Sequence, residues 1–408
     1  MNIGIIKKIK DQRNIAYNQI YSIFSFLINL VISVVIIKLV TTYIDPENYG
    51  VYKYVLAVIG LCGITTISGI NKTIGGYVAK NYHGTVKETT KLCIKTGVIG
   101  VIVLIIFGLY SFYIKDYLTE AILFFVAAVV FIPYVIFPRY QAILAGLYKF
   151  KDRFILQSVF LAAMLIGAIV VLVVFKKGIL AYGISQMTIQ TSCLIVFFIL
   201  TYKKLSNNYV DEGFLKHSVI ISLFGIGSHI ITPGIQIYLN YTLGSSALAF
   251  YMIADSIRGV SSGAAKSIMS PIVMKLARKD KLEHSTAILK LIPLTLVFGL
   301  ILYGCIFVCI HTLGSFIIDK QYNISLFYAK LLTLAIIFAP LYSLLRGNVL
   351  FEKNNRGYAI TIYTGQALQF IGYVLFVNRF GIPAIAFTNF IATAVSTALM
   401  IYYIKDSC

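Results

Sequence analysis

Twelve apolar runs of 20 to 28 residues, separated by shorter polar connections, constrain this chain of 408 residues more than any other feature. A helix needs about 20 consecutive, mostly apolar residues to cross the hydrocarbon core of a bilayer, so each run is long enough to span a membrane. Only 12% of the residues are charged, whereas soluble domains have roughly a quarter. The sequence therefore predicts an all-α polytopic membrane protein. We expect its transmembrane helices at residues 19–43, 51–70, 92–114, 121–145, 154–175, 179–202, 217–241, 247–274, 287–310, 325–345, 358–377 and 382–404.

The net charge of +20 is distributed in a way that indicates membrane topology and not nucleic-acid binding. Twenty-five Lys and Arg residues fall in one set of alternate connections and termini, and only five fall in the other set. Cytoplasmic connections of membrane proteins carry an excess of Lys and Arg, so the richer set, which includes both termini, is expected in the cytoplasm. The first apolar run is too long for a cleavable signal peptide, and we expect it to be the first span.

Short motifs recur after about 200 residues and indicate an internal duplication. The stretch FPRY from Phe137 returns as APLY 202 residues later, and GILAYGISQ from Gly178 returns as GIPAIAFTN 203 residues later. A polar stripe at steps of three and four residues also occurs in both the first and the seventh run. Because six spans are an even number, both halves enter the membrane with the same orientation. We therefore predict two six-helix halves, residues 1–202 and 203–408, related by a parallel repeat around a central cavity.

The eighth run carries charges at a depth that is costly in lipid. Asp255, Arg258 and Lys266 share one helix face, because 100° per residue brings Asp255 and Lys266 to within about 20° of each other. With about 1.5 Å rise per residue, Asp255 lies about 12 Å and Arg258 about 16 Å below the outer surface. One explanation is a structural Asp255–Arg258 pair within the helix. A water-filled, net cationic cavity explains all three charges, and we prefer this interpretation.

Polar residues on the first and seventh runs are expected to line the same path, because these runs are equivalent in the repeat. Asn29 in the first run, and Gln236 and Asn240 in the seventh, are candidate partners for sugar hydroxyl groups. Lys53, near the outer end of the second run, is a further cationic candidate for substrate binding. A lysine at this depth can also snorkel to the headgroup region, which is the more ordinary role for it.

The deep titratable residues are candidates for ion coupling. His229 in the seventh run and Asp255 in the eighth lie at similar depth, and we expect at least one to make transport depend on a proton or sodium gradient. The sequence contains no phosphate-binding Walker loop and no residues at metal-ligand spacing. Five of its six cysteines fall within or at the ends of apolar runs, so a disulfide framework is not expected. We therefore expect neither a metal nor a cofactor.

Three stretches carry a resemblance to a known family: LVTTYIDPENYGVYKYV from Leu39, KNYHGTVKETTK from Lys80 and GLYKFKDR from Gly146. With the duplicated halves, they make the whole chain resemble the polysaccharide repeat-unit flippases, the Wzx-type exporters of O-antigen and capsule units. These belong to the multidrug/oligosaccharidyl-lipid/polysaccharide exporter superfamily. The chain departs from its relatives at Asn240, where an acidic residue is frequent, and it has no room for the two additional helices of lipid II flippases.

The resemblance implies a transporter and not an enzyme. Such a flippase moves an undecaprenyl-pyrophosphate-linked oligosaccharide from the inner to the outer leaflet of a bacterial inner (cytoplasmic) membrane by alternating access. The implied partners are this lipid-linked oligosaccharide, membrane lipid and polysaccharide assembly proteins. A cationic lumen suits this substrate, because it offsets the cost of taking the pyrophosphate charge through a region of low dielectric constant.

Two alternatives remain open at this point. A multidrug antiporter of the same fold would move cationic compounds and would need an acidic cavity, whereas the deep charges here are mostly Arg and Lys. A membrane polysaccharide polymerase or ligase would be expected to have a long external loop with catalytic groups, and every expected external connection is short. Both alternatives are therefore less favoured than a flippase.

Overall fold

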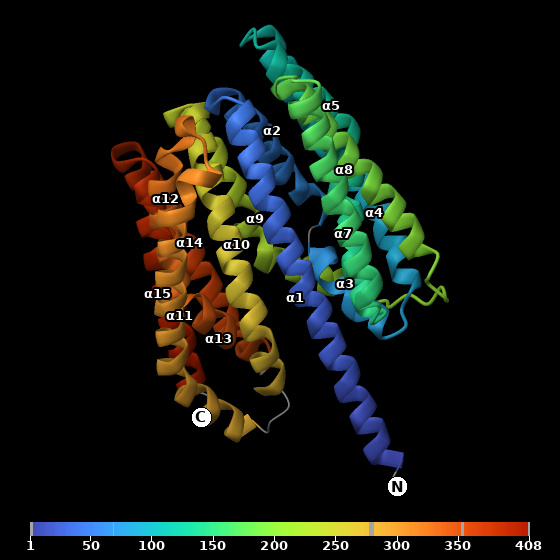
Figure 1. Ribbon diagram of the computed structural model, residues 1–408. Helices are drawn as coiled ribbons and strands as arrows, with labels where there is room; N and C mark the ends of the chain where they lie inside the picture. The colour runs from blue at the N-terminus through green and yellow to red at the C-terminus, as the bar shows by residue number, and fades with distance from the viewer. Residues whose placement is uncertain (1–2, 68, 277–280, 352–354, 407–408) are drawn as a thin grey trace. The chain divides into compact units, whose positions relative to one another are not determined.

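The structure of the protein is a computed structural model that describes residues 3–67, 69–276, 281–351 and 355–406 (Figure 1). Within these ranges the chain forms helices and loops and no β-strand, which confirms the predicted all-α class. The α-helices are α1 (Ile3–Tyr43), α2 (Pro46–Cys62), α3 (Gly69–Ala79), α4 (Gly84–Tyr113), α5 (Leu118–Ile136), α6 (Tyr140–Gly146), α7 (Phe150–Ile169), α8 (Ile179–Tyr202), α9 (Phe214–Leu243), α10 (Ser245–Leu276), α11 (Lys281–Ile317), α12 (Ile324–Leu332), α13 (Ala339–Phe351), α14 (Asn355–Phe380) and α15 (Ile382–Asp406).

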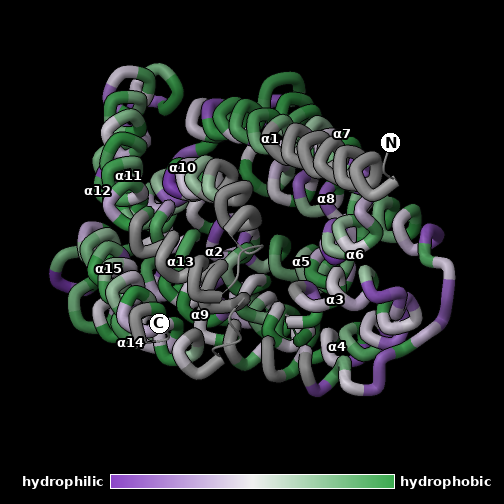
Figure 2. Tube along the Cα trace, turned by 90° about the horizontal axis from the view of Figure 1, so that it is seen from below, coloured by the Kyte–Doolittle hydropathy of each residue, from purple (hydrophilic) through white to green (hydrophobic). Residues whose placement is uncertain are grey.

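The helices have the length and apolarity that a bilayer requires. Among the described residues, ten segments, some of them two helices joined across a short turn, are long and apolar enough to span a membrane. Helices α9 and α10, of 30 and 32 residues, match the predicted seventh and eighth spans, which carry most of the polar candidates. Where Figure 2 colours the helices by hydropathy, they are mainly in the hydrophobic colours, and hydrophilic stretches lie mostly in the connections. The twelve-helix polytopic layout agrees with this description.

The chain divides into two compact units. Unit 1 comprises residues 1–36 and 62–225, and unit 2 comprises residues 37–61 and 226–408. Helices α1 and α9, which are equivalent in the sequence repeat, each give their first part to unit 1 and their last part to unit 2. Unit 2 therefore includes α2 from the beginning of the chain. The boundary between sequence halves at residues 202 and 203 stays a prediction.

Breaks in the helices follow the sequence repeat. The 3₁₀ turn Phe137–Arg139 separates α5 from α6, and the 3₁₀ turn Thr333–Phe338 separates α12 from α13. Pro138 lies in the first turn, and Pro340 is the second residue of α13, which follows the other turn. Proline lacks the backbone N–H that a continuous α-helix needs at this point. Gly178 and Gly381, which open the motifs GILAYGISQ and GIPAIAFTN, directly precede α8 and α15. Equivalent motifs thus produce equivalent local structure in the two halves.

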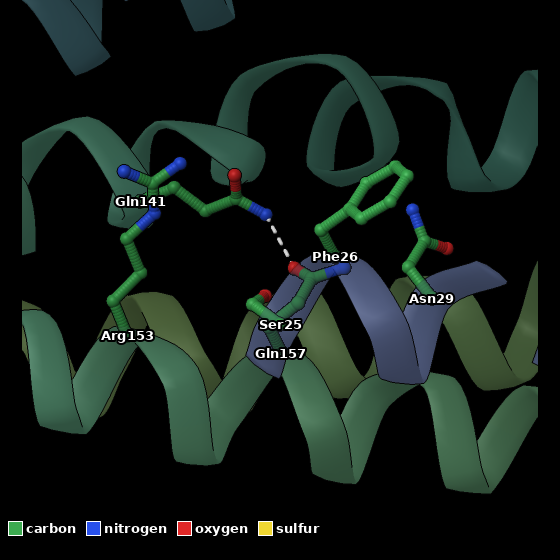
Figure 3. Close-up of a pocket in the computed structure, with 6 residues that line it drawn as sticks. All are labelled: Ser25, Phe26, Asn29, Gln141, Arg153 and Gln157. Carbon is green, nitrogen blue, oxygen red and sulfur yellow. Dashed lines mark hydrogen bonds between the residues drawn. The ribbon is translucent and has the colours of Figure 1, made fainter. Parts of the chain in front are cut away.

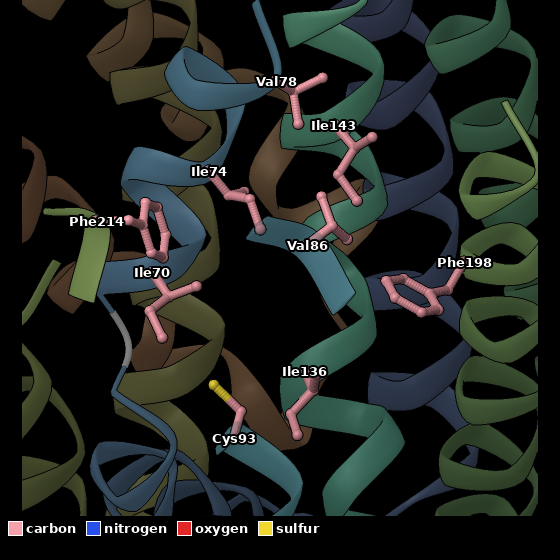
Figure 4. Packing of buried hydrophobic residues seen from close by; sticks show 9 residues of the cluster. All are labelled: Ile70, Ile74, Val78, Val86, Cys93, Ile136, Ile143, Phe198 and Phe214. Carbon is pink, nitrogen blue, oxygen red and sulfur yellow. The ribbon is translucent and has the colours of Figure 1, made fainter. Parts of the chain in front are cut away.

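Unit 1 is held together around α3. Its buried apolar cluster is formed by residues of α3, α4, α5, α6, α8 and α9, shown in Figure 4: Ile70, Ile74, Val78, Val86, Cys93, Ile136, Ile143, Phe198 and Phe214. Helix α3 approaches α6 so closely that a Cβ atom added to Gly75 would lie 2.7 Å from the carbonyl oxygen of Ala142. Such contact through small residues is typical of helix packing in membranes, and it fixes the position of α6.

Unit 2 has its own core and a capped second helix. Met269 of α10 packs in a buried cluster with residues of α13 and α15: Leu341, Leu344, Leu345, Met400 and Ile404. Helix α2 begins where it does because Asp45 caps it: the Asp45 carboxylate accepts a hydrogen bond from the Asn48 backbone N–H at 2.9 Å, and Pro46 occupies the first helical position. Although burial raises the pKa of Asp45, the hydrogen bonds from Asn48 outweigh this effect, so the pKa lies below its usual value.

The second and eighth spans differ although the repeat makes them equivalent. The second is broken: α2 ends at Cys62, a 3₁₀ turn follows at Gly63–Thr66, and Ile67 has φ of 51° before α3 begins. A β-branched residue in the left-handed region costs roughly 1–3 kcal/mol. The eighth span, α10, is continuous over 32 residues and contains the deep charges. The repeat therefore preserves the breaks of the fourth and tenth spans but not that of the second.

Candidate functional site

The deep charges of α10 form an ion pair. Arg258 donates from Nε to Asp255 Oδ1 at 2.7 Å, and its second nitrogen, Nη2, lies 2.6 Å from the same oxygen. The pair, three residues apart, is only partly exposed. Because both contacts use one carboxylate oxygen, the other oxygen of Asp255 and the Nη1 group of Arg258 have no hydrogen-bond partner among the described residues. The structure thus contains the pair that the sequence allows, with part of the guanidinium still available.

Aromatic and amide side chains of α10, α14 and α15 form a polar group around this ion pair in unit 2. Tyr251, one turn before Asp255, and Tyr373 of α14 interact electrostatically with both charges. The hydroxyl group of Tyr373 donates to Asn389 Oδ1 of α15, and the amide of Gln369 donates to the same oxygen at 3.0 Å. We call these six residues, Tyr251, Asp255, Arg258, Gln369, Tyr373 and Asn389, the unit 2 polar cluster. It joins three helices inside the membrane-spanning part of the unit.

The sequence repeat contains a signal for part of this cluster. Asn389 lies in the motif GIPAIAFTN, at the position that Gln186 occupies in GILAYGISQ. Both side chains are buried, and Gln186 donates to the backbone oxygen of Met164 at 3.1 Å. A buried amide at the same place in both halves therefore could have been found by aligning the motifs. Tyr251, Gln369 and Tyr373 carry no comparable signal.

Of the other predicted residues of unit 2, Lys53 interacts with the cluster. Lys53 of α2 interacts electrostatically with Asp255, and its ammonium group lies over the rings of Tyr49 and Tyr52, at 5.0 and 5.8 Å from their centres. This arrangement gives the cation two aromatic faces inside the unit. The side chain of Lys266 lies outside the part of the chain that the structure describes.

The predicted residues of α9 have separate surroundings. Asn240 accepts a hydrogen bond from the Ser245 hydroxyl group at 2.9 Å and so ties the end of α9 to the start of α10. Gln236 and His229 are half-buried on α9. For Asn240, a role in holding the turn between the helices is the one its contact supports directly. Roles of Gln236 and His229 in substrate binding and coupling stay predictions.

Asn29 lies in the other unit, where it lines an open pocket of about 240 Å³ (Figure 3). The lining comes from α1, α6 and α7, and we call this site the unit 1 polar pocket: Ser25, Phe26, Asn29, Gln141, Arg153 and Gln157. In Figure 3 the guanidinium group of Arg153 and the amide of Gln141 are on one side of the view, Asn29 is on the other, and the Phe26 ring is seen between them. The structure therefore places Asn29 in a different unit from the other predicted candidates and gives it new neighbours.

Hydrogen bonds fix the amides of the unit 1 polar pocket. Gln141 Nε2 donates to Gln157 Oε1 at 2.6 Å, and the hydroxyl group of Tyr140 donates to the same oxygen at 3.3 Å. Asn29 Oδ1 accepts from the Ser33 hydroxyl group at 3.3 Å. Gln141 and Gln157 were not among the predicted site residues. Arg153 was not either, although it ends the stretch GLYKFKDR on which the family resemblance depends.

Two of the three helices of this pocket meet at a turn on the side of the N-terminus. The fourth candidate span ends at Gly146, and the fifth starts at Phe150. Residue 141 and residues 153 to 157 therefore lie within about two turns of these ends. This part of the pocket is near the ends of its spans, whereas Arg258 lies near the middle of α10.

A comparison with protein families identifies the chain. Residues 15–277, more than half of its length, match the model of a family described as polysaccharide biosynthesis protein. The chain belongs to this family. The resemblance to polysaccharide exporters that the sequence motifs carry is confirmed at this level, and so are transport and polysaccharide biosynthesis as the field of function. No curated protein matches the chain by sequence.

Solved structures with the same fold are transporters. A multidrug resistance MATE family transporter of the MOP superfamily, inward-facing, has a TM-score of 0.67 and 12% identity, covering 95% of this chain and 98% of its own. The lipid II flippase MurJ, in an inward closed conformation, has a TM-score of 0.66 and 16% identity, covering 96% and 87%. A MOP superfamily transporter from Pyrococcus furiosus Vc1 has a TM-score of 0.66 and 12% identity, covering 97% and 95%. The family member therefore has the fold of a MOP superfamily transporter.

Proposed function

We propose that the protein is a flippase that moves a polyprenyl-pyrophosphate-linked oligosaccharide from the inner to the outer leaflet by alternating access. The observation that carries the proposal is the partly exposed side chain of Arg258 within a membrane-spanning helix. A cation at this depth costs at least about 2.5 kcal/mol on the most lenient scale. Asp255 offsets this cost, and the Nη1 group that the ion pair leaves unbound is the part of Arg258 that a ligand can take. Membership of the polysaccharide biosynthesis protein family supports an anionic, sugar-bearing substrate as that ligand.

The pair geometry suggests how Arg258 acts. A guanidinium group can hold a phosphate by two parallel hydrogen bonds, whereas an ammonium group offers a point charge. When the site is empty, Asp255 neutralises Arg258; when the head group arrives, the pyrophosphate takes over the Nη groups and Asp255 keeps the site from binding it too tightly. Lys53 and Lys266 add positive charge, and Gln236 and Asn240 offer amide groups to the sugars. Asn29 offers an amide group in unit 1.

Ion coupling and orientation belong to the same proposal. Asp255 and His229 are the coupling candidates. Protonation of Asp255 changes the charge beside Arg258, and protonation of His229 changes the charge on the neighbouring span, α9. The excess of Lys and Arg in one set of connections supports a cytoplasmic membrane location with both termini in the cytoplasm. Polysaccharide assembly proteins are further proposed partners.

Other functions receive less support from the same residues. An antiporter for cationic drugs needs an available carboxylate, and the carboxylate of Asp255 is already bound to Arg258. The likeness to a MATE transporter at 12% identity concerns the fold alone. A polymerase needs catalytic groups outside the membrane, and the expected external connections are short.

A double-mutant comparison in the polysaccharide-producing host tests the role of Arg258. We expect Arg258→Ala combined with Asp255→Asn to be present at normal abundance, to lack surface polysaccharide and to accumulate lipid-linked oligosaccharide. Arg258→Lys should keep partial activity, because the charge remains while the two-pronged geometry is lost. A double mutant with normal abundance and normal surface polysaccharide would reduce Arg258 to a structural partner of Asp255.

A further inference from the structure

The unit 1 polar pocket is rich in hydrogen-bond donors that have no acceptor. The oxygen of Gln157 already accepts from Gln141 and Tyr140, and the oxygen of Asn29 accepts from Ser33. The NH2 groups of Asn29 and Gln157 make no hydrogen bond to another described residue. The internal contacts therefore engage the oxygens of Gln157 and Asn29 and leave their NH2 groups for a ligand. Although the oxygen of Gln141 accepts no hydrogen bond from a described residue, these NH2 groups and the guanidinium group of Arg153 make donors predominate, which favours a ligand rich in acceptor oxygens.

The charge of the pocket also favours a ligand with acceptor oxygens, because it is positive. No carboxylate is among its six lining residues, and Arg153 forms no ion pair with a described side chain. Asp152, the adjacent residue, is bound to Lys204 instead. The guanidinium group of Arg153 therefore keeps its positive charge and its paired donors, the arrangement that matches an oxyanion. The guanidinium group of Arg258 differs from that of Arg153, because it already forms an ion pair with Asp255.

The size and shape of the pocket further limit the kinds of ligand that it can bind. At about 240 Å³ the pocket is smaller than most drug-sized sites, so it has room for one head group and not for a whole oligosaccharide. The half-buried ring of Phe26 gives it one apolar wall between polar groups. A sugar ring has apolar C–H faces and polar edges, and it can lie against such a wall with its oxygens toward the amides.

We propose that the unit 1 polar pocket binds an oxyanion attached to the first sugar of the transported lipid, as an entry site separate from the unit 2 polar cluster. The oxyanion is either the phosphate group of the lipid carrier or the carboxylate of an acidic sugar. This inference deepens the proposed function and rests on it for the identity of the ligand. With the N-terminus in the cytoplasm, the pocket faces the leaflet in which the substrate is made.

The absence of tryptophan from the chain permits a direct binding experiment. Phe26→Trp places a single tryptophan in the pocket of the purified, detergent-solubilised full chain, and Phe380→Trp places one at an exposed position in unit 2. Farnesyl diphosphate, farnesol, glucuronate and glucose are the probes. We expect farnesyl diphosphate to change the tryptophan emission of the Phe26→Trp variant saturably and farnesol to leave it unchanged. Neither probe should change the tryptophan emission of the Phe380→Trp variant specifically.

Two neutralising variants identify the charge that is responsible. Arg153→Gln in the Phe26→Trp background should weaken binding at least tenfold, whereas Lys151→Gln, which removes one charge from an exposed position two residues earlier, should change it less than twofold. Binding of farnesyl diphosphate without glucuronate assigns the site to the carrier phosphate, and the reverse assigns it to an acidic sugar. Calorimetric titration of the wild-type chain and Arg153→Gln repeats the measurement without the added tryptophan.

Some results would overturn this inference without touching the proposed function. Equal responses to farnesol and farnesyl diphosphate, or equal affinities of Arg153→Gln and Lys151→Gln, would show that the pocket is not an oxyanion site, while transport could still proceed. Conversely, a protein that binds the anion at Arg153 but never moves a lipid-linked saccharide would contradict the proposed function and leave the site in place.

Discussion

The two polar sites of the molecule use arginine in opposite ways. In unit 2, Arg258 is bound to Asp255 on the same helix, and the surrounding tyrosines and amides come from α10, α14 and α15. In unit 1, Arg153 has no carboxylate partner among the described side chains, and its neighbours come from α1, α6 and α7. A paired charge inside the membrane can stay there without a ligand, whereas an unpaired charge needs access to water or to an anion. An anion can therefore bind Arg153 without displacing a carboxylate, whereas an anion at Arg258 competes with Asp255.

The largest effect on stability is expected at the buried amides that the repeat makes equivalent. Asn389→Leu leaves two donors, the Tyr373 hydroxyl group and the Gln369 amide, without an acceptor, at about 1–3 kcal/mol each. Gln186→Leu removes only an additional hydrogen bond to the backbone oxygen of Met164, which lies inside α7 and also accepts the helical bond. Thermal unfolding in detergent should therefore show a lower midpoint for Asn389→Leu than for Gln186→Leu. The opposite order would mean that the amide network of unit 2 does not hold its helices together.

The close contact between α3 and α6 should matter for the unit 1 polar pocket, because it positions Gln141. Gly75→Ala brings a methyl group to within 2.7 Å of the Ala142 oxygen, and overpacking of this kind costs about 1–3 kcal/mol. Gly76→Ala is the matched control, since nothing lies within 4 Å of its added Cβ. We expect the first variant to unfold at a lower temperature than the second and to weaken anion binding in unit 1. Equal unfolding temperatures and equal anion affinities of the two variants would show that the contact between α3 and α6 does not position the pocket.

The sequence predicted those features that depend on periodicity along the chain. Apolar runs placed the spans, and the helical period placed Asp255 and Arg258 on one face, where they form a pair. The repeated motifs predicted two equivalent halves, but the helix breaks and helix starts that these motifs share appear only in the structure. Asn29, in contrast, meets Gln141 and Arg153 only through packing of three helices, the first of which is more than 100 residues from the others in sequence. No local pattern encodes that meeting, and none predicts the break at Ile67, where a β-branched residue takes a conformation it normally avoids.

The smallest effect is expected at the helix cap that positions α2 and, with it, Lys53. Asp45→Ala removes the hydrogen bond to the Asn48 N–H and should lower the free energy of unfolding by about 1 kcal/mol. Because folding lowers the pKa of Asp45, its contribution is present above the pKa of the unfolded chain and is lost as the pH falls through the lower, folded value. Asp45→Asn should keep the cap and lose this pH dependence. Equal stabilities of the wild type and Asp45→Ala at pH 7 would contradict the capping role.

Reconstitution tests the central claim, that this chain moves an anionic lipid-linked saccharide between leaflets through Arg258. The purified protein is placed in vesicles that contain a polyprenyl-pyrophosphate-linked saccharide with a fluorophore that a membrane-impermeant reductant bleaches. We predict that the reductant bleaches the inner-leaflet fraction as well in vesicles with the wild-type chain, because the lipid reaches the outer leaflet. In vesicles with Arg258→Ala combined with Asp255→Asn, bleaching should stop at the outer-leaflet fraction. Bleaching that stops there with the wild-type chain too, as in protein-free vesicles, or that is complete with the double mutant, would contradict the account.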